Sequence, residues 1–368
     1  MVTCDPKVDA YYMGAALSLA LRGTGRVSPN PMVGCVIVGP EGVVGWGFHE
    51  GPGEPHAEAV ALDRAGEKAR GATLYVNLEP CCHQGRTPPC APRIIKTGIA
   101  RVVAGMADPD PRVSCRGFGM LREAGVKVTE GLLLQRCREM NRGFLSRIER
   151  GRPWVTLKGA VTLDGNMAMA SGESRWISNA FSRVRSHMLR DSNDAVVVGV
   201  GTVISDDPEL TVRDTTGRDP VAVVLDPSLR TPQWARIVRR GTIIFFSRSA
   251  RKEKLEQLEQ RGCTLFRVPA DMEGRPQLEL VLQRLAEVGV NSVLVEGGPN
   301  ILGSFMTLGL FDSVALFVST RFSGRGQGIG GGLAIGRLAD SIGIRTVRVR
   351  NLEGDLWLEG VKPCSQVW

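Results

Sequence analysis

No apolar run in the sequence reaches the roughly 18–20 residues that a membrane-spanning helix needs, and the first thirty residues lack a secretory signal pattern. We therefore expect a soluble, cytoplasmic protein with no membrane partner. Aromatic residues make up only 5% of the chain, whereas 43% of the residues are hydrophobic and 23% are charged. This composition excludes a disordered scaffold, a collagen-like repeat and a disulfide-dense secreted module. The length of 368 residues favours two domains.

A concentrated basic segment is also missing. The net charge is +8, but lysine and arginine are spread along the whole chain, so the charge fits phosphorylated small molecules as well as nucleic acid. The nine cysteines are an odd number, and Cys81, Cys82 and Cys90 are not spaced like a disulfide framework. Three of the only four histidines lie between residues 49 and 83, around these cysteines. The pattern indicates a reduced compartment and a metal site with thiolate ligands.

The chain divides into two α/β halves. Residues 33–148 alternate between strand-like and helical patterns, which predicts a layered sheet. The charged, turn-prone segment 149–153 interrupts both periodicities, and its proline cannot prolong a helix. A second alternation begins just after it. We therefore predict a domain at 1–148, a linker at 149–153 and a second domain at 154–368.

Three segments predict particular elements. Residues 132–148 form one amphipathic stretch, which predicts a single helix, and residues 195–201 read as a strand. Residues 347–361 alternate at period two around a turn-like Glu-Gly-Asp. This last pattern predicts an antiparallel hairpin at a sheet edge.

The sequence holds the residues of a catalytic zinc site. His56 and Glu58 open a predicted helix, Cys81 directly follows a proline, and Cys90 begins another predicted helix. Zinc takes imidazole and thiolate ligands, and a catalytic site uses three protein ligands and leaves the fourth position to water. A helix N-terminus favours the thiolate form of cysteine. Glu58 would lie beside the metal, where it can take a proton from water and return it to a leaving amine. We predict hydrolytic deamination.

Two alternatives concern these same residues. The cysteines could form a structural zinc site, or they could be unconnected reduced thiols. Cys82 could also compete with Cys81 for the metal. We favour His56, Cys81 and Cys90 as the ligands, because Cys81 directly follows the proline of the deaminase signature.

The segment EPCCHQGRTPPC closely resembles the deaminase motif of the bifunctional riboflavin-biosynthesis deaminase/reductase family. The resemblance continues through both halves in PNPMVGCVIV, GEPHAEAVAL, ADPDPRVSCRGFGML, TLDGNMAMASGESRWIS, GVGTVISDDPELTVR and VEGG. It implies a cytidine-deaminase-like three-layer domain followed by a dihydrofolate-reductase-like α/β domain. It also implies one zinc ion and NADPH as cofactors, and a homo-oligomer. The implied reactions are deamination of 2,5-diamino-6-(ribosylamino)-4(3H)-pyrimidinone 5′-phosphate and reduction of the product's ribosyl chain to ribityl.

Carried over residue by residue, the resemblance places Asn30, His49, His83 and Arg86 around the pyrimidine. Taken alone, His49 would be a strand-end surface residue, Asn30 a turn former and Arg86 a solvated arginine. Three positions depart from the family pattern and put fine substrate contacts in question: Cys82, Gln84 and Asn166.

The second half gives weaker signals by itself. SVLVEGGPNILGSF combines an apolar strand, two glycines and a helix start, a geometry that binds phosphate or simply makes a tight turn. The resemblance implies substrate contacts from Lys158, Ser174, Arg190, Leu210, Arg213 and Glu296, with Lys158 catalytic. It implies cofactor contacts from Ala160, Trp176, Thr202, Asp206, Gly298, Pro299, Asn300, Ile301, Leu302, Gly303 and Ser304.

The chemistry of these residues is consistent with those roles. Arg190 and Arg213 can grip a phosphate bidentately, Glu296 can hold hydroxyl groups, and Lys158 can polarise a carbonyl or imine. Arg248 is a further candidate for the 2′-phosphate of NADPH, although a solvated loop arginine is the more common state. The glycine-rich segment 322–336 is either a mobile flap or a plain loop.

Two rival functions predict different behaviour. A nucleoside or tRNA-base deaminase with an unrelated second domain would carry a conventional Cys-x-x-Cys, which this segment lacks. A zinc-stabilised nucleic-acid-binding module would bind DNA or RNA with a steep salt dependence, and it leaves Glu58 without a role. We expect phosphorylated pyrimidine substrates and no nucleic-acid partner.

Overall fold

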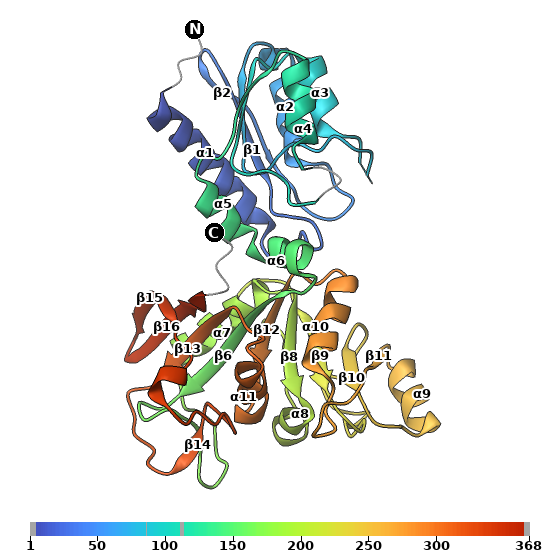
Figure 1. Cartoon of the computed structure of the whole chain (residues 1–368), viewed down its shortest axis with the longest axis vertical. Coiled ribbons are helices and arrows are strands. Elements are labelled where there is room, and N and C mark those ends of the chain that lie inside the picture. Colours follow the sequence, from blue (N-terminus) through green and yellow to red (C-terminus); the bar gives the residue numbers. More distant parts are fainter. Residues whose placement is uncertain (1–4, 86, 111–113, 364–368) are drawn as a thin grey trace. The chain divides into compact units, whose positions relative to one another are not determined.

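The computed structural model describes residues 5–85, 87–110 and 114–363. Contacts between residues divide the chain into two compact units between Arg150 and Gly151 (Figure 1). The helix that ends the first unit continues through Arg150, two residues into the predicted linker. It ends there because Gly151 adopts a positive φ of 66°, a conformation that terminates helices and favours glycine.

The first unit contains a five-stranded sheet in the order β2-β1-β3-β4-β5. β1 is antiparallel to β2 and β3, whereas β3, β4 and β5 run parallel to one another. The end of β2, the start of β1 and the end of β3 therefore meet at one edge of the sheet. The strands are β1 (Gly34–Gly39), β2 (Gly42–Phe48), β3 (Thr73–Val76), β4 (Arg101–Ala104) and β5 (Lys127–Thr129).

Helices cover both faces of this sheet. The helices are α1 (Pro6–Ala20), α2 (Ala57–Ala65), α3 (Cys90–Thr97), α4 (Arg116–Glu123), α5 (Leu134–Met140) and α6 (Arg142–Arg150). α2, α3 and α4 share one core with Ile37 and Leu74, and Figure 1 shows α1 and α5 on the opposite side. Alternate strand residues face each layer. The predicted three-layer domain is confirmed.

The prediction of one helix over residues 132–148 is wrong. The segment forms two helices, α5 and α6, which are separated at Asn141. The buried Asn141 side chain accepts a hydrogen bond from the Met32 backbone N–H at 2.8 Å and donates one to the Met32 carbonyl at 3.0 Å. The helix is therefore interrupted at the residue whose side chain binds the Met32 backbone.

The second unit contains a nine-stranded sheet in the order β11-β10-β9-β8-β12-β6-β13-β16-β15. The strands from β11 to β13 in that order run parallel, and β16 and β15 add the predicted antiparallel hairpin at the edge. A separate pair joins β7 to β14. The strands are β6 (Trp154–Val161), β7 (Asn166–Met169), β8 (Ala195–Gly199), β9 (Val221–Leu225), β10 (Ile243–Phe246), β11 (Thr264–Arg267), β12 (Ser292–Glu296), β13 (Ser313–Val318), β14 (Gly326–Gly328), β15 (Arg345–Leu352) and β16 (Asp355–Val361).

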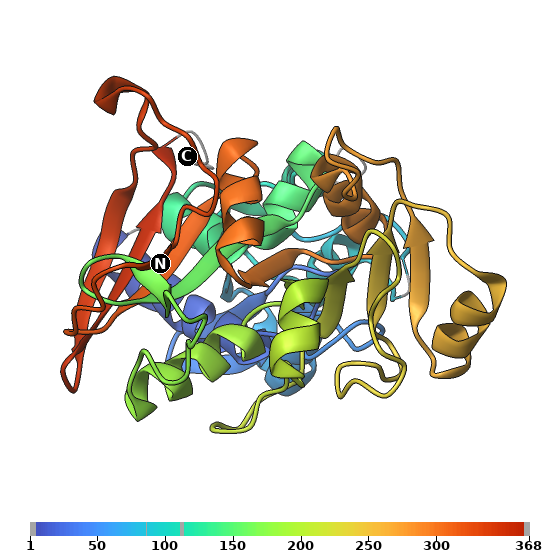
Figure 2. The ribbon, with the colours of Figure 1, turned by 90° about the horizontal axis from the view of Figure 1, so that it is seen from below.

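Two apolar cores flank the large sheet. The helices are α7 (Ala180–Asp191), α8 (Val200–Asp206), α9 (Lys252–Gln260), α10 (Leu278–Glu287) and α11 (Pro299–Thr307). Val223 faces the core that contains α10 and α11, whereas the next residue, Val224, faces the core that contains α8 and α9. Figure 2 shows α10 and α11 on one side of the sheet and α7 and α8 on the other. Within the described ranges, no helix has the length and apolarity to cross a bilayer.

Candidate active sites

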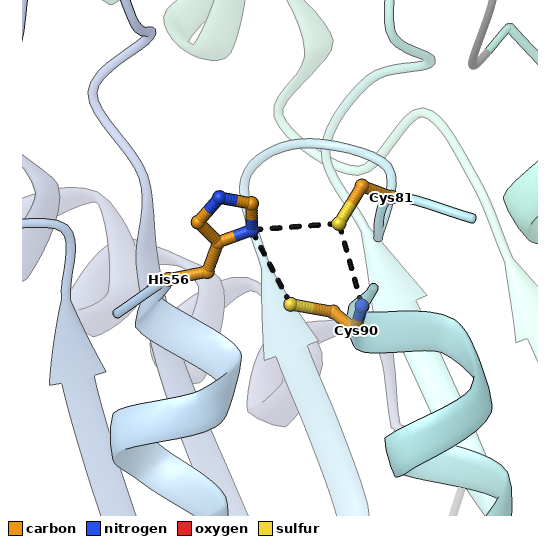
Figure 3. Close-up of side chains that lie close together, drawn as sticks. All are labelled: His56, Cys81 and Cys90. Atoms are coloured by element: carbon orange, nitrogen blue, oxygen red, sulfur yellow. Dashed lines mark hydrogen bonds between the residues drawn. The ribbon is translucent and has the colours of Figure 1, made fainter. Parts of the chain in front are cut away.

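Three side chains converge at the sheet edge of the first unit, where β2 and β3 end. His56 is the N-cap of α2, Cys90 is the first residue of α3, and Cys81 lies in the loop after β3. The His56 Nδ1 atom lies 3.4 Å from the sulfur of Cys81 and 3.4 Å from that of Cys90 (Figure 3). Among the residues that the structure describes, these three form the group whose ligand atoms could hold a metal ion.

The arrangement fits zinc. Tetrahedral coordination with Zn–N of about 2.0–2.1 Å and Zn–S of about 2.3 Å separates ligand atoms by roughly 3.5 Å, and the observed spacing is 3.4 Å. The other ring nitrogen of His56 lies 3.1 Å from the Thr87 hydroxyl, a partner that orients the ring. Three protein ligands leave one position for water. Cys82 does not belong to this group.

The two thiols differ in acidity. The pKa of Cys81 is lowered to about 4 because Cys90 and His56 donate hydrogen bonds to its sulfur. The hydrogen bond to Cys81, together with burial, raises the pKa of Cys90. The pKa of His56 is raised by its hydrogen bond to Cys81. The cluster therefore holds protons that a metal displaces when it binds.

Glu58 lies in the first turn of α2, beside the cluster. Its side chain is buried, and burial, followed by the charge of Cys81, raises its pKa to about 7. The carboxyl group also makes a hydrogen bond with Cys90. A carboxyl group held next to a metal site without belonging to its ligand set can accept and return a proton.

The structure brings Asn30 and His49 to the same edge. The rings of His49 and His56 lie 5.6 Å apart in an edge-to-face arrangement. The Nδ1–H group of His49 donates to the Pro55 carbonyl at 3.2 Å, and Nε2 accepts from the Asn30 amide at 2.9 Å. Burial lowers the pKa of His49, which keeps its ring neutral.

The loop between the two cysteines carries the other predicted pyrimidine contacts. The Nδ1 atom of His83 is buried and has no hydrogen-bond partner among the residues that the structure describes. Arg86 lies outside the described residues. Gln84 is exposed.

Sequence reasoning missed Asn77, which holds the backbone next to Asn30. Its buried side chain accepts from the Gly34 N–H at 2.8 Å and donates to the Met32 carbonyl at 2.9 Å. Asn141, much further along the chain, also binds the backbone N–H and carbonyl of Met32. Their only sequence signal is an asparagine directly after a buried strand and another within an amphipathic helix pattern.

In the second unit, Lys158, Arg190 and Glu296 form one charged cluster around the buried Glu296 carboxylate. Lys158 and Glu296 are register partners on the parallel strands β6 and β12, and their charged atoms lie 3.7 Å apart. Arg190, on α7, donates to both oxygens of Glu296, at 2.8 and 2.9 Å. Burial acts to raise the pKa of Glu296, but the charges of Arg190 and Lys158 outweigh it and lower the pKa to about 2.

This cluster changes the expectation for the arginines. Arg190 gives Nε–H and one terminal N–H to Glu296 and another N–H to the Thr211 carbonyl at 3.0 Å. In this structure, the face of the Arg190 guanidinium that could grip a phosphate bidentately holds the Glu296 carboxylate. Arg213 lies near half exposure and pairs with Glu209 at 2.6 Å.

The remaining predicted contacts lie on several segments of the second unit. Thr202 and Asp206 lie on α8, and Arg175 donates to the Asp206 carbonyl at 3.0 Å, which joins the neighbouring Trp176 to this helix. Trp176 is 65% exposed and is therefore not a core residue. Ala160 lies on β6, Ser174 is exposed and Leu210 is buried.

The chain turns to opposite faces of the sheet after β8 and β12. These strands are neighbours, yet α8 packs on one face and α11 on the other. Such a point is where open α/β sheets bind nucleotides. Residues 298–304 form the N-cap and first turns of α11 at this point. Arg248 lies just after β10. In the sheet, β9 lies between β10 and β8, so Arg248 follows a strand that is not adjacent to β8.

The glycine-rich segment 322–336 is anchored at two places. Its strand β14 pairs with β7. Its glycines also lie against α11, because a Cβ atom added to Gly303 would come within 2.2 Å of the Gly331 carbonyl oxygen. Only glycine allows this approach.

The comparisons define the class of the protein. Residues 6–106 match the cytidine and deoxycytidylate deaminase zinc-binding region, and residues 153–356 match the RibD C-terminal domain. Together with the geometry of the metal site, these matches show that the protein is a bifunctional enzyme. It joins a zinc-binding deaminase to an NADPH-using reductase.

Similar full-length proteins identify the family. The chain is 43% identical over 354 residues to riboflavin biosynthesis protein RibD of Aquifex aeolicus, covering 95% of this chain and 97% of the relative. It is 39% identical over 364 residues to that of Escherichia coli, covering 95% and 98%. The solved structure of Acinetobacter baumannii RibD has 35% identity and a TM-score of 0.89 over 97% of this chain and 99% of that one. The chain belongs to the RibD family of riboflavin-biosynthesis proteins. The family, fold, activities and cofactors implied by the sequence resemblance are confirmed.

Proposed function

We propose that the chain catalyses two consecutive steps on one phosphorylated pyrimidine. The first unit hydrolyses the 2-amino group of 2,5-diamino-6-(ribosylamino)-4(3H)-pyrimidinone 5′-phosphate. The second reduces the ribosyl chain of the product to ribityl. A structural relative from Thermotoga maritima, 34% identical with a TM-score of 0.86, bears the description diaminohydroxyphosphoribosylaminopyrimidine deaminase/5-amino-6-(5-phosphoribosylamino)uracil reductase. The observation that carries the proposal is the His56, Cys81 and Cys90 cluster with Glu58 beside it.

In the first unit, His56, Cys81 and Cys90 would hold zinc, which would lower the pKa of a water molecule so that it can attack. Glu58 takes the proton from that water and returns it to the amine that leaves as ammonia. Water is consumed, the carbon–nitrogen bond breaks and a carbonyl remains. Asn30, His49, His83 and Arg86 orient the ring. The hydrogen bonds of His49 to Pro55 and Asn30 support this role, because they orient its ring before substrate enters.

In the second unit, bound NADPH would be the source of a hydride for the ribosyl chain. Lys158 polarises the reacting carbon–oxygen or carbon–nitrogen double bond, and Glu296, held by Arg190, binds sugar hydroxyls. Ser174, Leu210 and Arg213 complete the substrate contacts. The cofactor contacts come from Ala160, Trp176, Thr202, Asp206 and residues 298–304. The change of face between α8 and α11 supports this placement.

We further propose that each unit is a domain that works on its own site, with boundaries near 1–148 and 154–368. The enzyme works in the cytoplasm as a homo-oligomer and has no nucleic-acid partner. The spread of basic residues along the chain supports the last point.

The test supplies the diaminopyrimidinone phosphate with and without NADPH and follows ammonia release and NADPH absorbance. Glu58→Gln should keep its zinc and lose about 10²–10⁴-fold in ammonia release, the usual contribution of a general acid–base group. The same variant should still reduce deaminated substrate. Zinc loss in this variant, or unchanged ammonia release, would show that Glu58 has another role.

A further inference from the structure

Glu79 is a buried carboxylate that accepts four backbone N–H groups. One oxygen accepts from Gly117 at 2.9 Å and Phe118 at 3.2 Å, and the other from Asp108 at 3.1 Å and Cys115 at 3.0 Å. Three of these donors belong to the N-cap and first turn of α4, where helix N–H groups have no partner within the helix. A negative charge is also favourable at that end of a helix.

The same helix turn touches the backbone next to Cys81. A Cβ atom added to Gly117 would lie 2.1 Å from the Pro80 carbonyl oxygen, so α4 packs directly on the peptide that precedes Cys81. On its other side, Cys81 is held by α3. The Cys81 carbonyl accepts from the Ala91 N–H at 3.0 Å, and its sulfur accepts from the Cys90 N–H at 3.3 Å.

We propose that Glu79 and Gly117 form a clamp that fixes Cys81 at the metal-binding distance from His56 and Cys90. Glu79 is a positioning residue, because it acts through the backbone of Cys81 and does not contact the reacting atoms. The proposal explains the segment 107–121, which the family resemblance includes but the catalytic roles do not use: its backbone N–H groups hold Glu79. It rests on the proposed role of Cys81 as a zinc ligand.

The chemistry of the clamp requires a carboxylate. All four partners are donors, and an ionised carboxyl group offers only acceptors. A glutamine would turn an NH₂ group toward two of these N–H groups. An aspartate keeps the acceptors but is one methylene shorter, so it cannot reach both pairs of donors in the same backbone position.

The experiment measures zinc affinity of the full chain by competition with a chelating dye, in E79Q, E79D and G117A. Loss of an outer contact of a metal site typically lowers affinity about 10- to 100-fold, and we expect a loss of that size with one zinc still bound at saturation. Reductase turnover in the same samples should stay unchanged. The matched controls on α4 are G119A, where a Cβ meets no atom within 4 Å, and the exposed Glu123→Gln.

The possible results of this experiment distinguish failure of the clamp proposal from failure of the assignment of Cys81 as a zinc ligand. A purely structural Glu79 would lower the melting temperature of the zinc-free chain but leave the zinc affinity of the folded protein equal to that of the controls, and this result would overturn the proposal. If E79Q does not fold, E79D and G117A decide by the same comparison. Failure of the ligand assignment looks different: the unaltered chain binds no zinc, or Cys81→Ser binds it normally.

Discussion

Replacing Glu296 by glutamine tests the charged cluster of the second unit. In the fold, Arg190 and Lys158 lower the pKa of Glu296 from 4.5 to about 2. Each tenfold change in proton affinity corresponds to about 1.36 kcal/mol, so the cluster stabilises the ionised carboxylate by about 3 kcal/mol. Its side chain is only 9% exposed, so solvent screening is small. The substitution removes this contribution and leaves two partly buried cations without their counter-ion.

The sign of the pH dependence follows from the lowered pKa. The contribution of Glu296 to stability is fully present above pH 4.5 and is lost as the pH falls toward about 2. The difference in unfolding free energy between the unaltered chain and Glu296→Gln should therefore be about 3 kcal/mol near neutral pH and should shrink over that acidic range.

Urea unfolding followed by tryptophan fluorescence measures this difference, because the fully buried Trp154 and Trp357 both lie in the second unit. The exposed Glu259 on α9 provides the control substitution to glutamine. NADPH oxidation should fall in Glu296→Gln, with ammonia release retained. If the two glutamine variants unfold at the same urea concentration, or if the difference does not depend on pH, Glu296 is not held by these cations and the reasoning is wrong.

Two further predictions concern single positions. Cys81→Ser should lose stoichiometric zinc and Cys82→Ser should keep it, since only Cys81 lies with His56 and Cys90; metal analysis of both purified proteins checks this, and the reverse result would exchange the two cysteines. Gly303→Ala should push the glycine-rich segment away from α11 and raise the KM for NADPH without changing ammonia release. Gly343→Ala, where a Cβ meets no atom within 4 Å, is its control, and equal KM values in the two variants would contradict the prediction.

The zinc cluster could be predicted from sequence because its chemistry is local. His56 caps a helix, Cys90 begins one, and both positions can be recognised from neighbouring residues. The edge hairpin was equally visible, because residues 347–361 alternate at period two in the sequence, although in the structure nearly all of β15 is exposed. By contrast, the predicted strand at 195–201 ends at Gly199, since the chain enters α8 at the next residue.

Other features depend on contacts between distant segments and have no local signal. α1 was not predicted, although Asp5 caps its first turn through the Lys7 N–H. Glu79 looks like one more acidic loop residue until α4 folds against it. Arg190 and Glu296 pair across more than a hundred positions in the chain. Sequence patterns report which residues share a helix or strand, but they do not report which loops meet.

Both sites nevertheless lie where parallel strands end. In the first unit, β2 and β3 deliver His49 and the loop of Cys81 to one edge. In the second, β12 ends at Glu296, in register with Lys158 on β6. In the second unit, Lys158 and Glu296 lie on the strands themselves, whereas in the first unit the metal-site residues lie in loops and at helix starts that follow strands. The motif after β3 therefore predicted the deaminase from its own chemistry, whereas the reductase was inferred from the family resemblance.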